Sequence, residues 1–150
     1  MNREIKFKAK SLDTNEWVYG TYVYTNDNKN NPFNVKHIKE THNICCYSNG
    51  DWNMGGWDFV EIDKTTLGQY TGLKDKNGNE IYEGDIIRTP YLDPIFGDIV
   101  NDVFENAIVE FNNGSFIVKY SDKNIYLFDL LNYIEIIGNV YDNSELLKDF

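Results

Sequence analysis

Alternation of apolar and polar residues is the feature that most limits what this chain can fold into. Residues 5–9 read Ile-Lys-Phe-Lys-Ala, and residues 17–24 are almost all β-branched or aromatic. A period of two places every second side chain on the same face, which is typical of half-buried β-strands. Further strands are predicted at 35–38, 43–47, 107–111, 115–120 and 134–141. No long amphipathic helix is indicated, so the sequence predicts a mainly β protein.

Turn signals organise the centre of the chain. Asn77-Gly78 predicts a type I′ hairpin turn, because both of its central positions favour positive φ. Residues 81–88 then predict one strand with a kink at Gly84. Residues 89–106 contain two of the three prolines and predict a long, irregular insertion.

Helical signals are short and lie near the C-terminal end. Residues 127–131 predict a single helical turn. Asp142 or Asn143 is a suitable cap for a short terminal helix over 144–149. We therefore predict a mainly β fold, formally α+β with one short C-terminal helix. It would comprise an N-terminal β-rich subdomain at 1–66 and a C-terminal SH3-like small barrel at 67–150, with one continuous domain as the alternative.

Charge excludes two classes of partner. The chain has 14 Lys and Arg against 24 Asp and Glu, a net charge of −10. Non-specific duplex nucleic acid and anionic membranes both require basic surfaces. Residues 1–40 carry a balance of +2 and the remainder −12. This asymmetry would suit head-to-tail contacts between subunits, but a solvated acidic surface explains it more simply.

The first residues, the lack of a long apolar run and the cysteines together predict an intracellular protein. The first residues lack the apolar core of a signal peptide, and no run approaches the ~18 apolar residues of a membrane span. Cys45 and Cys46 are adjacent, and neighbouring residues rarely meet the geometry of a disulfide. We therefore expect free thiols in a cytoplasm.

Three arrangements that resemble ligand motifs are better explained otherwise. Residues 68–74 lack the Gly-Lys-Ser/Thr ending of a phosphate loop. Residues 75–86 lack the Gly and Glu that a calcium loop requires at its sixth and twelfth positions. His37, His42, Cys45 and Cys46 cluster in sequence, but their spacing is not that of a zinc site or a Cys–His catalytic pair. We predict no cofactor and no metal.

Aromatic residues supply the best candidates for binding. Trp52, Trp57, Phe59, Tyr47 and Tyr70 would form a stacking platform for a planar ligand, or alternatively core and subunit interface. An anionic ligand would use one of the two arginines, a lysine or backbone amides. The candidate ligand-binding residues are Arg3, Trp52, Trp57, Tyr70 and Arg88.

One pair of carboxylates flanks a glycine in the centre of the chain. Glu83 and Asp85 would lie on the same face of a strand, where two carboxylates can act as acid and base. We instead expect Asp85 to accept backbone hydrogen bonds at a barrel entry turn. No catalytic residue is therefore assigned, and an enzyme is not expected.

The central motif resembles the YopX family of phage and prophage proteins. The resemblance begins at Arg3-Glu4-Ile5-Lys6-Phe7 and Trp17-Val18-Tyr19-Gly20, and ends at residues 136–143 with Leu146-Leu147. It departs at 25–58 and 89–106. The structural motif at its centre comprises Gly68, Gln69, Tyr70, Gly72, Asn77, Gly78, Glu83, Gly84 and Asp85.

The resemblance implies an accessory protein in a bacterial cytoplasm and supplies no catalytic residues. We expect a non-enzymatic protein that acts by binding as a homo-oligomer. Two alternatives remain open. One is a counter-defence sponge that sequesters a small nucleotide signalling molecule. The other is a protein–protein interaction module that inhibits a host factor, using the barrel and the 89–106 segment.

Overall fold

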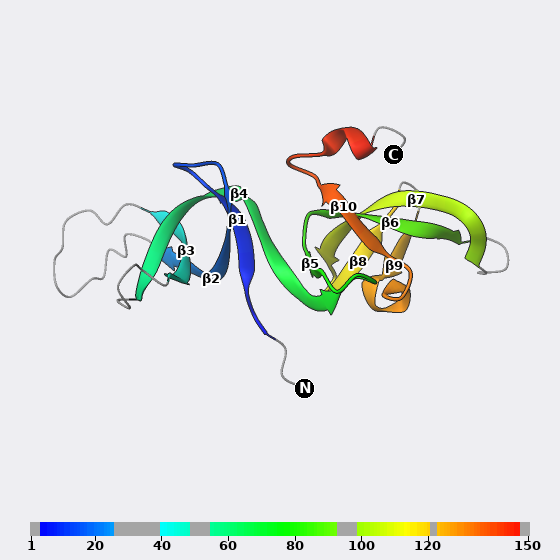
Figure 1. Cartoon of the computed structure of the whole chain (residues 1–150), viewed down its shortest axis with the longest axis horizontal. Helices are drawn as coiled ribbons and strands as arrows, with labels where there is room; N and C mark the ends of the chain where they lie inside the picture. Colours follow the sequence, from blue (N-terminus) through cyan, green and yellow to red (C-terminus); the bar gives the residue numbers. More distant parts are fainter. Residues whose placement is uncertain (1–3, 26–39, 49–54, 93–98, 121–122, 148–150) are drawn as a thin grey trace. The chain divides into compact units, whose positions relative to one another are not determined.

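The computed structural model describes residues 4–25, 40–48, 55–92, 99–120 and 123–147 (Figure 1). Residues 35–38, Arg3 and Trp52, for which the sequence made predictions, lie outside this part. The chain divides into two compact units. The N-terminal unit is Ile5–Gln69, and the C-terminal unit is Tyr70–Phe150 together with Met1–Glu4. One long strand, β4 (Gly56–Lys74), contributes to both.

The N-terminal unit is a closed ring of four antiparallel strands, in which β1 pairs with both β2 and β4. Closure of this kind leaves no open sheet edge at β1. The predicted strands at 5–9, 17–24 and 43–47 are confirmed, with slightly different bounds. The other three strands are β1 (Phe7–Ser11), β2 (Trp17–Thr25) and β3 (Thr41–Ser48).

The interior of this ring is a small apolar core. Ala9, Ile44 and Ile62 are buried at its centre. The partly buried residues around them are Phe7, Val18, Tyr22 and Leu67. These residues lie on the inner faces of their strands, because successive side chains of a strand point to opposite sides.

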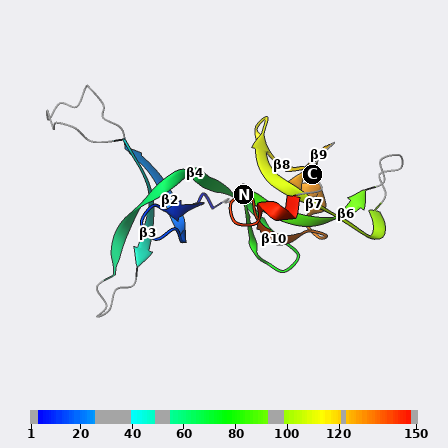
Figure 2. The ribbon, with the colours of Figure 1, turned by 90° about the horizontal axis from the view of Figure 1, so that it is seen from above.

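The C-terminal unit is built on an antiparallel sheet with the strand order β10-β6-β7-β8-β9. Strand β7 curves strongly along its length and appears as the yellow-green arc in Figures 1 and 2. Strand β5 pairs with β4 in a hairpin. The strands are β5 (Glu80–Tyr82), β6 (Asp85–Leu92), β7 (Ile99–Asn112), β8 (Ser115–Lys119), β9 (Asn124–Tyr126) and β10 (Glu135–Asn139).

An apolar cluster lies at the centre of this unit. The curved sheet contributes Ile87, Val109 and Val118, which are fully buried. A 3-10 turn, η1 (Leu127–Leu130), covers them with Leu127 and Leu130, and the predicted helical turn at 127–131 is thus confirmed. The described residues are mainly β, as the sequence predicts, and the curved sheet is barrel-like. An SH3-like closure stays a prediction.

Two predictions for the chain between 81 and 106 are wrong. Residues 81–88 are not one strand, because a turn at Glu83-Gly84 separates β5 from β6. Residues 89–106 are not an irregular insertion, because β6 and β7 extend through 89–92 and 99–106. Pro90 lies within β6, next to a register shift between Pro90 and Tyr91. A bulge tolerates a residue that lacks an N–H, so proline there does not end the strand.

The predicted C-terminal helix is reduced to one 3-10 turn, η2 (Ser144–Leu147). The backbone N–H of Leu146 donates to the carbonyl of Asn143, which is the short-range bond of such a turn. Residues 148–149 lie outside the described part. Within that part no helix is long and apolar enough to cross a membrane.

Candidate functional site

The central sequence motif builds a turn and not a binding loop. The backbone N–H of Gly78 donates to the carbonyl of Asp75 at 3.0 Å, and that of Asp75 donates to Asn79 at 2.9 Å. Gly78 has a φ of +85°, whereas Asn77 is not among the residues with positive φ. The turn is therefore a type I turn followed by a glycine bulge, and the type I′ prediction is wrong.

The carboxylate of Asp75 fastens this turn to β10. Its oxygens accept hydrogen bonds from the N–H groups of Asn77 and Asn79, from the Asn79 side chain and from the N–H of Ile136, at 2.9–3.2 Å. Burial alone would raise the pKa of Asp75, but these hydrogen bonds lower it below its ordinary value. An ion pair of 2.7 Å between Lys76 Nζ and Glu135 Oε2 adds a second link.

Glu83 and Asp85 do not act as a carboxylate pair on one strand, and Asp85 bonds the backbone. They do not share a strand, because Glu83 belongs to the turn that precedes β6. Asp85 is buried, and its Oδ2 accepts a hydrogen bond of 2.8 Å from the N–H of Tyr82, the backbone role expected for it. Gly84, with a φ of +85°, bonds Val109 through its N–H and Val140 through its carbonyl.

Four exposed aromatic side chains share the outer face of the N-terminal ring. Strand register pairs Tyr47 with Trp57 and Cys45 with Phe59, while the next pair, Ile44 with Val60, faces inward. Paired residues lie on the same face, so Tyr47, Trp57 and Phe59 all point outward. Tyr19 joins them, since its neighbour Val18 packs on the core. We call Tyr19, Tyr47, Trp57 and Phe59 the aromatic face.

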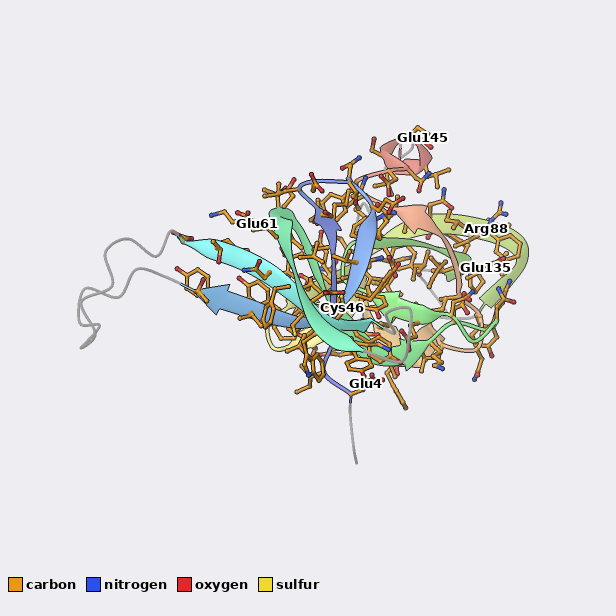
Figure 3. All side chains as sticks on the ribbon, turned by 60° about the vertical axis from the view of Figure 1, so that its left-hand side comes forward. Glu4, Cys46, Glu61, Arg88, Glu135 and Glu145 are labelled. Carbon is orange, nitrogen blue, oxygen red and sulfur yellow. The ribbon has the colours of Figure 1, made fainter. Side chains whose placement is uncertain are left out.

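The rings of the aromatic face are largely uncovered. Their exposed fractions are 52% for Tyr19, 57% for Tyr47, 68% for Trp57 and 62% for Phe59. Tyr47 and Trp57 contact each other edge to face, with centroids 5.4 Å apart. Exposed aromatic clusters of this kind are unusual outside binding surfaces. Figure 3 shows the strands that carry them, with Cys46 labelled on β3 and Glu61 on β4.

The predicted ligand-binding residues fall in different places. Trp57 belongs to the aromatic face of the N-terminal unit. Tyr70 is 5% exposed and packs against Tyr82 in the C-terminal unit, which makes it a core residue. Arg88, also in the C-terminal unit, is exposed above the ring of Phe104 at 5.4 Å (Figure 3). The prediction of a shared ligand site stays untested for these residues.

A polar chain inside the N-terminal unit was not foreseen from the sequence. His42 Nδ1 lies 2.6 Å from the hydroxyl of Tyr22, and its Nε2 lies 3.1 Å from Glu40 Oε1. Burial raises the pKa of Tyr22, and the neighbouring Tyr24 and Glu40 raise it further. The raised pKa keeps Tyr22 a neutral phenol, and its hydrogen bond with His42 links strand β2 to strand β3. Nothing in the sequence indicated that β2 and β3 would bring these residues together.

The cluster of His and Cys residues does not form a metal site in the described part of the chain. Cys45 and Cys46 are successive residues of β3 and face opposite sides of the sheet. No group of three or more potential metal-ligating side chains occurs among the described residues. His37 lies outside that part.

The chain is similar to a known protein family and to a protein of known structure. The family described as YopX protein matches residues 6–148. The crystal structure of protein EF1440 from Enterococcus faecalis is similar, with a TM-score of 0.57 and 23% sequence identity. The match covers 98% of this chain and 100% of that one, and shows a likeness of fold. No curated protein sequence matches the chain.

Proposed function

The chain belongs to the YopX family, and we propose that it is a non-enzymatic phage or prophage accessory protein of the bacterial cytoplasm. It acts by binding, and it binds first to a second copy of itself. The aromatic face carries this proposal, because four rings that are each more than half exposed are costly to leave in water. Tyrosine and tryptophan are also the residues that dominate the centres of protein interfaces.

The border of the aromatic face supports a second copy as the occupant. Lys10 lies on the same outer face, next to the ring of Trp17, while Glu61 is exposed beside Phe59. The border therefore carries both signs of charge. A two-fold contact places the same patch on both sides, and a border of mixed sign avoids the repulsion that a border of one sign would cause.

A binding role agrees with the hydrogen bonds that the polar side chains described above make. Asp75 and Asp85 accept hydrogen bonds from backbone N–H groups, and Tyr22 shares a hydrogen bond with His42. These arrangements stabilise turns and strands.

The double variant Trp57→Ser with Phe59→Ser tests self-association. We expect it to weaken the dimer by at least about 30-fold, because central tryptophans typically contribute 2 kcal/mol or more to an interface. Light scattering over a concentration series measures the change. Phe128→Ser is the matched control, since Phe128 is 72% exposed in the other unit, and it should leave the dimer unchanged.

Two results would contradict this assignment. A wild-type chain that stays monomeric at every concentration removes self-association altogether. A double variant that is folded by circular dichroism and dimerises normally removes the aromatic face from the interface.

A nucleotide sponge is the second candidate, and the exposed indole of Trp57 favours it. Tyr47 and Trp57 meet edge to face, with 74° between the ring planes, and Trp57 is 68% exposed, so ring surface remains available for stacking with a base. Thermal unfolding with a panel of cyclic nucleotides and ADP-ribose derivatives tests it. Stabilisation that is lost in Trp57→Ser would support the sponge, and no stabilisation by any member would count against it.

A further inference from the structure

Lys123 holds its ammonium group between two tyrosine rings in the C-terminal unit. Its Nζ lies 5.0 Å from the ring centroid of Tyr91 and 4.9 Å from that of Tyr120. Both distances are within the roughly 6 Å range of a cation–π contact. Two rings around one cation form part of a cage, the usual way in which proteins recognise organic ammonium groups.

The carboxylate of Glu105 lies near the ammonium group of Lys123, and one of its oxygens has no hydrogen-bond donor among the described residues. Glu105 Oε2 lies 3.8 Å from Lys123 Nζ, too far for a hydrogen bond. The oxygen is shielded from solvent and accepts no hydrogen bond from the described residues. A buried acceptor without a donor is costly, so this position favours a cation that brings an N–H closer than Lys123 does.

The walls of the cage are fixed by the fold. Tyr120 is 4% exposed, and its hydroxyl lies 2.6 Å from Oγ1 of the fully buried Thr89. Burial raises the pKa of Tyr120, so its ring carries no charge at neutral pH. Tyr91 and Glu105 come from the paired strands β6 and β7. The backbone N–H of Tyr120 donates to the carbonyl of Lys123 at 2.9 Å, which holds the lysine at the cage.

We propose that Tyr91, Glu105 and Tyr120 form a binding site for an organic ammonium group with N–H donors, and that Lys123 is an internal occupant that such a group displaces. The site is independent of self-association through the aromatic face. The net charge of −10 favours a cationic ligand by raising its concentration near the protein. The ammonium group comes either from a free amine or from a lysine side chain of a partner protein.

Chemical complementation of Lys123→Ala tests the cage. The substitution removes the equivalent of propylammonium, so we expect propylammonium chloride to raise the unfolding midpoint of this full-length variant by about 2–4 °C, with saturation. Tetramethylammonium chloride should raise it less, because it has no N–H for Glu105. Sodium chloride at the same concentration measures the part of the shift that comes from the screening of charges by salt.

Two further variants serve as controls. Lys119→Ala removes an exposed lysine that pairs with Glu110 at 2.9 Å, and its midpoint should not respond to propylammonium. The double variant Lys123→Ala with Glu105→Gln should lose most of the response, because the amide attracts a cation less than a carboxylate does. A response of equal size in Lys119→Ala, or none in Lys123→Ala, would overturn the site.

The wild-type chain tests displacement and also replaces the variant if Lys123→Ala does not fold. Titration with propylammonium should shift the ring NMR signals of Tyr91 and Tyr120 along a saturating curve. A short peptide with one lysine, compared with its norleucine analogue, distinguishes a partner's side chain from a free amine. If neither propylammonium nor the lysine peptide shifts these signals, Lys123 is a fixed clamp and the displacement proposal is wrong.

Discussion

Replacing Asp75 with alanine should lower the free energy of unfolding of the C-terminal unit by about 3 kcal/mol. The carboxylate accepts four hydrogen bonds, from two N–H groups of its own turn, from the Asn79 side chain and from the N–H of Ile136 in β10. Asp75 is 6% exposed, so water cannot fully replace the lost acceptor. The bond to Ile136 joins residues 61 positions apart, and its loss should loosen β10 from the hairpin.

The pH dependence of unfolding provides the sharper measurement. The pKa of Asp75 is lower in the folded protein than in the unfolded chain, so its contribution is complete above the unfolded pKa of about 3.9. That contribution declines as the pH falls through the lower, folded pKa. Urea unfolding between pH 7 and pH 2 should therefore show a steep acid loss in the wild type and a shallower one in Asp75→Ala.

Glu135→Gln is the matched control for this experiment. It removes the neighbouring ion pair with Lys76, which is solvent-exposed and should contribute much less. Peptide-resolved hydrogen exchange should show loss of protection in β10 for Asp75→Ala and little change for Glu135→Gln. Equal loss in both variants would show that the ion pair, and not the buried carboxylate, holds β10.

Local sequence signals predicted the strands and turns well, and their limits are visible at individual residues. The alternation at 5–9 correctly indicated a half-buried strand in which Phe7 and Ala9 face the core, although Ile5 is 65% exposed. Asn77-Gly78 marked a hairpin, but its turn type depends on Asp75, whose side chain bonds the N–H of Asn77 and holds that residue at negative φ. The prolines after 88 suggested an irregular segment, because a single sequence does not reveal that a bulge accommodates Pro90.

The candidate sites depend on register across strands, which local patterns do not contain. The sequence grouped Tyr47, Trp57, Phe59 and Tyr70 together as possible platform or core. The pleat turns the first three outward, while Tyr70 is buried against Tyr82, 12 residues further along the chain. The ammonium cage is harder to foresee, because Tyr91, Glu105 and Tyr120 come from three strands or strand ends. Long-range pairing alone brings them together.

Replacing Gly20 with alanine should destabilise the N-terminal unit by about 3 kcal/mol or more. A Cβ at this position would overlap the backbone carbonyl of Cys45 and press on Ile44 at 3.1 Å. The clash is with backbone, so a side-chain rotation cannot relieve it, and β2 must move away from β3. Gly56→Ala is the matched control, because a Cβ there meets nothing within 4 Å, and it should change stability little. Denaturant unfolding followed by circular dichroism measures both.

Combining Gly20→Ala with Asp75→Ala tests how the two units share stability. The substitutions lie in different units with separate apolar cores, so their effects on unfolding should add to within about 0.5 kcal/mol. Hydrogen exchange should then show each variant loosening its own unit. Strand β4 belongs to both units, because its residues 56–69 close the N-terminal ring and its residues 70–74 pair with β5. A larger coupling energy, with protection lost along all of β4 in either single variant, would mean that this strand makes the two units unfold as one.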